Sequence, residues 1–287
     1  MSHISIFLEL TRLKKPIGYM LLFWPCAWGL TIAYDFQQDF EKFIFYLVLF
    51  FLGSVLMRSA GCIVNDIVDK DFDKSVERTK YRPIASGKIS IKLAIIYTIV
   101  LCLLAFIILI NFNFITILLA IASMPLAFTY PLMKRFTYWP QLFLGITFNY
   151  GLILGWTSVN ENIGFIPILF YLGAIFWTLG YDTIYGFQDI EDDEIIGVKS
   201  TSIKFKKNPK IFLSICYLLF FICYLVMGTL LELNKYFYFV AIIVAIHLFM
   251  FQIFKFNKSK KIKCLSIFKS NNLVGLIVLS NILIGKI

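Results

Sequence analysis

Charge, histidine and paired cysteines are scarce in this chain, and each scarcity narrows the choice of protein class. Only 15% of the 287 residues are charged, 60% are hydrophobic and the mean hydropathy is +0.82, which is the composition of a polytopic membrane protein. The six cysteines include no CxxC pair and most lie inside apolar runs, so we interpret them as small buried side chains rather than as a disulfide frame or a metal cage. Both histidines are isolated in the sequence, and we expect neither to bind a metal.

What the chain has instead is a series of apolar runs of about twenty residues each, the length that an α-helix needs to cross a bilayer. They predict an all-α integral membrane protein that forms a single domain over residues 1–287. The first residues carry acidic and basic side chains and lack a small-residue cleavage site, so we expect no removable signal peptide. Nine spans are predicted, near residues 17–34, 43–64, 93–110, 115–133, 140–157, 165–188, 211–231, 236–254 and 270–286.

The connections between these spans alternate in length and in charge. One set, together with the N-terminal segment, holds 23 of the 27 Lys and Arg residues and consists of residues 1–16, 65–92, 134–139, 189–210 and 255–269. By the positive-inside rule, this set is cytoplasmic, and nine spans then leave the C-terminus outside. The net charge of +10 is therefore a topology signal, and we expect no nucleic-acid partner. The last basic run is interpreted as a loop that faces lipid.

Two of the cytoplasmic loops are acidic as well as basic. Residues 65–77 and 182–194 hold eleven of the seventeen Asp and Glu residues. If the second span continues as a helix past the membrane surface, an advance of about 100° per residue places four polar side chains on one face, with Arg58 about two turns deeper and Asp71 pointing away. The four side chains are Asn65, Asp66, Asp69 and Asp73.

The same arithmetic applied to GYDTIYGFQDIEDDEIIG places Asp182, Asp189 and Asp193 within about 40° of one another. Gly186 shares this face and would leave room for something bulky to approach. Asp182 and Arg58 lie within or at the edge of apolar spans, where a charge is costly and is by default a functional hypothesis. We therefore expect two carboxylate faces on the same side of the membrane.

Crowded carboxylates repel one another unless a cation neutralises them, and oxygen ligands without a nearby His or Cys favour Mg²⁺, Mn²⁺ or Ca²⁺ over zinc. Mg²⁺ takes one or two carboxylates and completes its octahedron with water and phosphate oxygens, so the pattern predicts a phosphorylated partner. Neighbouring basic residues can bind the phosphate charge that remains. These are Arg78, Lys80, Arg82 and Lys199. Acidic residues, metal and basic residues together describe a diphosphate clamp.

At these residues the chain resembles a known family. MRSAGCIVNDIVDKDFD is similar to the NDxxDxxxD region of the UbiA superfamily of intramembrane prenyltransferases, starting at Asn65, and DIEDD resembles its DxxxD motif, starting at Asp189. TYPLMKR matches YxxxK at Tyr130 and Lys134, and RLKKPIGYMLLFWP resembles the RLDRPIG…WP pattern, with Lys14 where the family usually has Asp. MRSAGC, ERTKYRP, GYDTIYGFQD and GVKST are most similar to the branch that prenylates 4-hydroxybenzoate in ubiquinone synthesis.

The resemblance implies nine transmembrane helices around a central cavity that opens to the cytoplasmic side and to lipid. It implies an enzyme that holds two Mg²⁺ ions and a polyprenyl diphosphate between the two Asp motifs and attaches the prenyl chain to an aromatic ring. For the branch named above, the acceptor is 4-hydroxybenzoate, its reacting carbon is ortho to the hydroxyl, and the enzyme lies in the lipid of the bacterial inner membrane.

Charge and the family match together assign roles to the site residues. The expected metal ligands are Asp66, Asp69, Asp73, Asp189 and Asp193, with Asn65 and Asp182 as their partners, and the expected phosphate contacts are Lys134, Arg78 and Arg82. Tyr130 would orient Lys134 or face the carbocation that forms at the prenyl carbon when diphosphate leaves. Pro131, between Tyr130 and Lys134, is expected to bend the helix. Arg58 would hold the benzoate carboxylate, with Arg135 as the competing candidate.

Two kinds of alternative remain open at this point. Other branches of the family use homogentisate, a dihydroxynaphthoate or haem as the acceptor. A transporter for a divalent cation or a phosphorylated metabolite would also need spans, carboxylates and basic residues. Transporters usually place such sites near the bilayer midplane on interrupted helices, whereas these clusters lie at one membrane face, so the sequence favours the enzyme.

Overall fold

Helices make up all the regular structure in the described part of the chain. The computed structural model describes residues 3–37 and 39–287, and no strand occurs among them, which confirms the all-α prediction. Only helices and closed barrels satisfy their own backbone hydrogen bonds inside a bilayer. Eight helical segments within these residues are long and apolar enough to cross a membrane: Phe40–Val68 (α3), Ile91–Leu109 (α5), Phe114–Phe136 (α6 to α7), Pro140–Asn160 (α8), Phe165–Gly186 (α9), Pro209–Leu230 (α12), Lys235–Ile253 (α13 with a π-helical end) and Lys261–Lys286 (α14).

The first predicted span corresponds to a shorter apolar helix, Ile17–Ala33 (α2), which has 17 residues. Each of the other predicted spans overlaps one of the eight longer segments. The largest differences are at the second span, whose helix extends to Val68, and at the last, whose helix begins at Lys261. In both cases the helix continues beyond the apolar run into polar sequence.

Two spans change their helical geometry along their length. α6 (Phe114–Thr129) passes through a 3-10 turn, Tyr130–Leu132, into α7 (Met133–Phe136). The expected disturbance at Pro131 is therefore present, because proline removes a backbone donor and clashes with the preceding turn. α13 (Lys235–Ala245) changes to a π-helical stretch at Ile246–Ile253.

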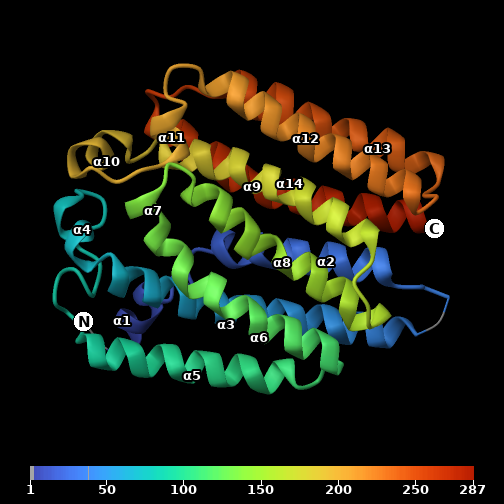
Figure 1. The fold of residues 1–287 in the computed structure, drawn as a ribbon, viewed down its shortest axis with the longest axis horizontal. Helices are drawn as coiled ribbons and strands as arrows, with labels where there is room; N and C mark the ends of the chain where they lie inside the picture. The colour runs from blue at the N-terminus through green and yellow to red at the C-terminus, as the bar shows by residue number, and fades with distance from the viewer. Residues whose placement is uncertain (1–2, 38) are drawn as a thin grey trace.

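The long helices run along the length of the molecule, and its two ends differ (Figure 1). The N-terminus lies at one end and the C-terminus at the other. The short helices gather at the N-terminal end, which agrees with the expectation that both acidic segments emerge on the same side. These helices are His3–Leu10 (α1), Lys70–Ser75 (α4), Ile190–Ile196 (α10) and Thr201–Lys204 (α11), together with α7.

The interior of the bundle is packed closely around α2, which contacts α3, α8 and α14. A Cβ on Gly29 of α2 would lie 2.0 Å from the carbonyl oxygen of Leu152 in α8, so glycine is what permits this approach. Trp28 of α2 stacks on Phe170 of α9 with ring centroids 5.5 Å apart. The outer faces of α5 and α6 instead expose many apolar side chains, as expected of helices that face lipid.

Candidate active site

The first acidic segment is a helix with one interruption. α3 ends at Val68, Asp69 follows with φ −95° and ψ 7°, and α4 begins at the next residue. The backbone N–H of Asp69 still donates to the Asn65 carbonyl at 2.9 Å, and that of Asp73 to the Asp69 carbonyl at 2.8 Å. The prediction of one unbroken helix is therefore wrong in detail, but the helical register continues across the break.

The same-face prediction for this segment is confirmed by burial. Asp66, Asp69 and Asp73 are buried with 2%, 2% and 6% exposure, whereas the side chain of Asp71 is 91% exposed and points away as expected. Asn65 is half-buried beside them. Three carboxylates are thus held out of solvent at the end of α3, a position that requires compensating charge.

Cationic side chains from three other segments supply that charge. Asp66 accepts from Arg12 at 2.5 Å and from Arg82 at 3.1 Å. The remaining pairs are Arg82 with Asp73 at 2.8 Å and Lys134 with Asp69 at 2.6 Å. Burial raises the pKa of Asp69, and the charge of Lys134 opposes that rise. The other carboxylate oxygen of Asp69, Oδ1, is buried and has no hydrogen-bond partner among the described residues.

The second acidic segment is broken where the sequence predicts a continuous helix. α9 ends at Gly186, a turn follows, and Asp189 is the residue that precedes α10. The helical arithmetic for this segment is therefore wrong beyond Gly186. Asp182 stays within the last turns of α9. Asp193 instead lies in the short helix α10, which covers this end of the bundle, and Asp189 directly precedes that helix.

Arg78 joins the two acidic segments. Its Nε and Nη2 atoms donate to the two carboxylate oxygens of Asp189 at 2.7 and 2.5 Å, a bidentate arrangement that fixes geometry as well as charge. Arg78 also lies 5.8 Å from the ring centroid of Tyr185. Burial, and then the neighbouring charge of Asp189, raise the pKa of Asp193 to about 7. Since α4 and α10 are also in contact, both motifs form one charged cluster.

The space beside Gly186 is filled by another helix of the same chain, α11. A Cβ at this position would lie 2.4 Å from the Oγ of Ser202 in α11. The neighbouring Thr183 hydroxyl is 2.6 Å from the Thr201 hydroxyl, and Ser202 Oγ donates to the Thr183 carbonyl at 2.8 Å. The expectation that Gly186 leaves room for a bulky ligand is thus corrected, because the glycine admits α11.

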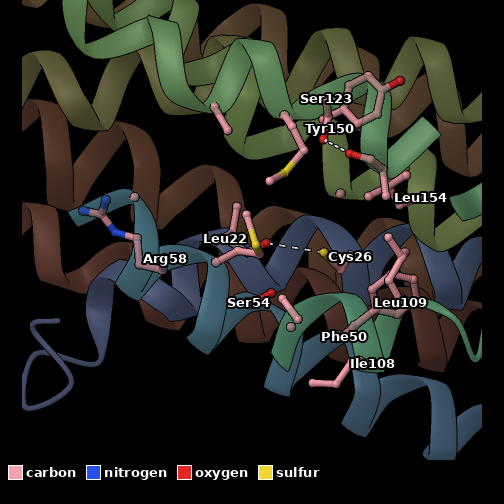
Figure 2. A pocket seen from close by; sticks show the side chains of 18 of the residues that line it. Leu22, Cys26, Phe50, Ser54, Arg58, Ile108, Leu109, Ser123, Tyr150 and Leu154 are labelled. Atoms are coloured by element: carbon pink, nitrogen blue, oxygen red, sulfur yellow. Dashed lines mark hydrogen bonds between the residues drawn. The ribbon is translucent and has the colours of Figure 1, made fainter. Parts of the chain in front are cut away.

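An apolar cavity of about 250 Å³ lies beneath the charged cluster. Side chains of α2, α3, α5, α6 and α8 line it. Figure 2 shows Arg58 at one end of the cavity and Ile108 and Leu109 at the other, with Tyr150 and Ser123 on a side wall. A long, mostly apolar space with one cation at its end suits a ligand with an apolar tail and a polar head.

Arg58 is the polar group at the head of this cavity. Its guanidinium carbon lies 5.2 Å from the ring centroid of Phe148, and its Nε is buried without a hydrogen-bond partner among the described residues. Tyr130 lines the same cavity, and its ring meets Phe148 edge to face at 6.5 Å. Arg58 lies on α3 about two turns before Asp66, so the cavity and the charged cluster adjoin along this helix.

Other basic residues proposed from the sequence are occupied elsewhere. Arg135 donates to the Val68 carbonyl at 2.7 Å and does not line the cavity, so the geometry favours Arg58 over Arg135 as the carboxylate-binding candidate. Lys80 pairs with Glu77 at 2.6 Å. Lys199 donates to the Phe136 carbonyl at 3.3 Å.

Sequence reasoning missed Arg12 as a member of the site. The sequence did place Arg12 in a basic run, RLKKP, directly before the first span. Arg12 and Asp66 are 54 residues apart, and helical arithmetic within one segment says nothing about pairing between segments. The backbone of Arg12 has a positive φ of 56° in the turn between α1 and α2, which marks an unusual local conformation for a residue other than glycine.

The oxygen donors of the cluster fit a hard divalent cation that is shared with a phosphorylated ligand. Within the described residues, no three His, Cys, Asp or Glu side chains form a metal cage. Mg²⁺ needs only one or two carboxylates when phosphate and water complete its shell. The unpartnered Oδ1 of Asp69 and the raised pKa of Asp193 are the observations that fit such an ion.

Known proteins with similar sequences are prenyltransferases. Residues 22–273 match the UbiA prenyltransferase family. A mitochondrial 4-hydroxybenzoate polyprenyltransferase of Drosophila pseudoobscura is 40% identical over 282 residues, or 98% of this chain and 70% of the relative. A 4-hydroxybenzoate octaprenyltransferase of Psychromonas ingrahamii is 39% identical over 279 residues, or 97% of this chain and 96% of the relative.

Two solved structures share the fold. A UbiA homologue from Aeropyrum pernix superposes with a TM-score of 0.77 at 22% identity, covering 93% of this chain and 98% of that one. A UbiA homologue from Archaeoglobus fulgidus bound to GPP and Mg²⁺ gives a TM-score of 0.70 at 18% identity, covering 96% of this chain and 99% of that one. The chain belongs to the UbiA prenyltransferase family.

Proposed function

We propose that this enzyme transfers a polyprenyl group from polyprenyl diphosphate to the ring carbon ortho to the hydroxyl of 4-hydroxybenzoate, releasing diphosphate, in ubiquinone biosynthesis. The observation that carries the proposal is the meeting of the charged cluster with the apolar cavity along α3, beside Arg58. The names of the relatives that are about 40% identical over most of the chain support this acceptor.

The diphosphate is proposed to bind between the two acidic segments. Asp66, Asp69 and Asp73 on one side and Asp189 and Asp193 on the other would hold Mg²⁺, for which we propose two ions, with Asn65 and Asp182 beside them. When bound, Mg²⁺ would neutralise diphosphate charge and stabilise it as the leaving group. The cations that now pair with the carboxylates would bind the phosphate oxygens. These are Arg12, Arg78, Arg82 and Lys134.

The proposed reaction forms no covalent bond between the protein and the substrates. The allylic C–O bond breaks and its electron pair stays on the diphosphate, leaving a carbocation at the prenyl carbon. The apolar lining excludes water from this cation, and the ring faces of Tyr130 and Phe148 stabilise it. The ortho carbon of the acceptor forms the new C–C bond, and the proton on that carbon passes to the released diphosphate.

Arg58 is proposed to orient the acceptor. It is a fixed cation with a buried, unpartnered Nε, so a benzoate carboxylate would satisfy a donor that the chain leaves open. A carboxylate held at the head of the cavity keeps the ring close to the place where the prenyl cation forms. Positioning of this kind is a large part of catalysis in two-substrate reactions.

For the membrane arrangement, we propose that α2 also crosses, which gives nine transmembrane helices around the cavity within one domain. Its 17 residues span about 26 Å, and a span slightly shorter than the hydrocarbon core is accommodated by local thinning. The N-terminus and both acidic segments would face the cytoplasm of a bacterial inner membrane, because their end of the bundle carries the basic loops.

The test is transfer of radiolabel in membranes that express this chain, supplied with labelled 4-hydroxybenzoate and a long polyprenyl diphosphate, with and without Mg²⁺. We expect a metal-dependent prenylated benzoate that is lost in Asp66→Ala and in Asp189→Ala. Product formation that survived chelation and both substitutions would contradict the two-segment site. A correctly inserted protein that prenylated homogentisate or a dihydroxynaphthoate but not 4-hydroxybenzoate would contradict the acceptor.

A further inference from the structure

A second hollow, of about 440 Å³, lies away from the charged cluster, where two basic loops meet. One loop joins α11 to α12, and the other joins the π-helical end of α13 to α14. Pro209 and Phe256 form its buried floor, and three exposed lysines stand around it: Lys207, Lys210 and Lys258. The loops are tied together because Lys258 Nζ donates to the Lys206 carbonyl at 3.2 Å.

The charge of this hollow is uncompensated. Among the residues that the structure describes, no acidic side chain lines it. Elsewhere in the same loops, Lys206 pairs with Glu194, and Lys261 pairs with Glu191 at 3.1 Å. The three lysines of the hollow form no such ion pair within residues 3–37 and 39–287, and Lys210 and Lys258 reach only backbone carbonyls. Three positive charges therefore line one hollow without an acidic partner among the described residues.

Backbone donors add to this positive character. α12 begins at Pro209, which has no N–H, and Asn208 makes no side-chain capping bond. The N–H groups of a first helical turn lack partners within their own helix, and Lys210 and Ile211, both in that turn, line the hollow. Lysine side chains and a helix N-terminus together provide donors suited to an oxyanion.

The position of the hollow indicates where that anion comes from. It lies where α12 starts and where the Lys235–Ile253 span ends, so it opens at the membrane boundary. Directly on the membrane side are large exposed apolar side chains, with Ile211 62% and Phe254 76% exposed. A soluble anion would gain nothing from these side chains, whereas a phospholipid would place its acyl chains against them.

We propose that this hollow binds the phosphate head group of an anionic phospholipid, with the acyl chains lying along the outer faces of α12 and the π-helical end of α13. Lys207, Lys210 and Lys258 neutralise the phosphate, and the first turn of α12 donates to its oxygens. The site is separate from the proposed prenyl-transfer site and does not depend on it. The sequence predicts only a basic loop that faces lipid, whereas the hollow gives that loop a defined place for one head group.

The test uses the full chain in nanodiscs and a photoactivatable phosphatidylglycerol, with the crosslinked peptides mapped by mass spectrometry. We expect labelling of the segments that flank the hollow, and a fall of about tenfold in the triple variant Lys207→Gln/Lys210→Gln/Lys258→Gln, because each lysine near an anionic head group contributes substantially to binding. The matched control is Lys255→Gln/Lys260→Gln/Lys263→Gln, which removes three exposed charges from the second loop and its continuation outside the hollow, and should retain most of the labelling.

Three results would overturn the proposal. An equal fall in the control triple would mean a diffuse charge effect. Equal competition by unlabelled phosphatidylcholine would remove the preference for an anionic head group. Competition by inorganic phosphate as strong as that by phosphatidylglycerol would assign the hollow to a soluble anion. If the triple variant of the hollow fails to fold, judged by its melting in detergent, the double variant Lys207→Gln/Lys258→Gln is compared with the control instead.

Discussion

The two acidic segments differ in how their carboxylates are paired with cations. In the first, each buried carboxylate has a cation from elsewhere in the chain, and Asp66 has two, Arg12 and Arg82. In the second, Asp189 is paired by Arg78, whereas Asp193 forms no ion pair in the described part of the chain and its pKa is raised to about 7 by burial and by Asp189. The fold therefore supplies a cation to each buried carboxylate of the first segment, whereas in the second it supplies one to Asp189 but forms no ion pair with Asp193 among the described residues.

This contrast has a physical basis in where each segment lies. The first continues a long helix of the bundle, so its carboxylates are buried as the bundle assembles and must be neutralised for folding. The second is a seven-residue helix, Ile190–Ile196, bounded by turns and by Gly197 at φ 81°. The first segment stays in the register of α3 across the break at Asp69, whereas a turn separates the second segment from α9.

The largest expected effect is that of Asp66→Asn. It removes the charge shared by two arginines, and we expect turnover to fall by about 10²- to 10³-fold because the leaving-group site loses its fixed charge pattern. The matched control is Asp71→Asn, the same change on an exposed side chain of the same segment. Initial rates of benzoate prenylation in nanodiscs measure both, and a similar loss in the two variants would contradict the face assignment.

A smaller and different effect is expected for Asp193→Asn. Because no cation among the described residues forms an ion pair with Asp193, the substitution breaks no such pair, and Tm in detergent should stay within about 2 °C of the parent. The apparent affinity for Mg²⁺ should fall about tenfold, since one carboxylate of the ion site is lost. The measurement is a Mg²⁺ titration of the rate, with melting recorded for Asp66→Asn in parallel. If Asp193→Asn lowered Tm more than Asp66→Asn, the contrast between the segments would be wrong.

The third effect separates acceptor binding from diphosphate binding. Arg58→Gln should raise KM for 4-hydroxybenzoate by about 10- to 100-fold, the range expected for a charged hydrogen bond, and leave KM for the polyprenyl diphosphate nearly unchanged. Arg135→Gln removes the same charge from a side chain that donates to the Val68 carbonyl and lies over the Phe72 ring, and should change neither KM more than about twofold. If Arg135→Gln raised KM for 4-hydroxybenzoate more than Arg58→Gln did, Arg135 and not Arg58 would bind the benzoate carboxylate.

Much of this arrangement could be read from the sequence because it depends on local periodicity. Apolar runs locate the helices, and the 3.6-residue repeat brings Asp66, Asp69 and Asp73 together while turning Asp71 away. The breaks at Asp69 and after Gly186 were not predicted, since a periodic calculation assumes that the helix continues. Asp189 nevertheless connects to the residue that follows the first segment, through its ion pair with Arg78 rather than through the register of α9.

What periodicity could not supply is pairing between distant segments. Arg12, from the turn before α2, reaches Asp66 at 2.5 Å, and nothing in RLKKP indicates that partner. Gly186 shows the converse, since its position on the acidic face suggested space for a ligand although α11 fills it. A residue's face on its own helix is a local property, but what approaches that face is decided by tertiary packing.

The most direct test of the central claim, that one diphosphate joins both acidic segments, is a double-mutant cycle on binding. Calorimetry with geranyl S-thiolodiphosphate, which resists cleavage, and excess Mg²⁺ would give Kd for the parent, Asp66→Asn, Asp193→Asn and the double variant. A shared site predicts that the double variant loses clearly less than the sum of the two single losses in binding free energy, because the two carboxylates serve the same ligand. Losses that add would mean that the segments act independently and would contradict the account.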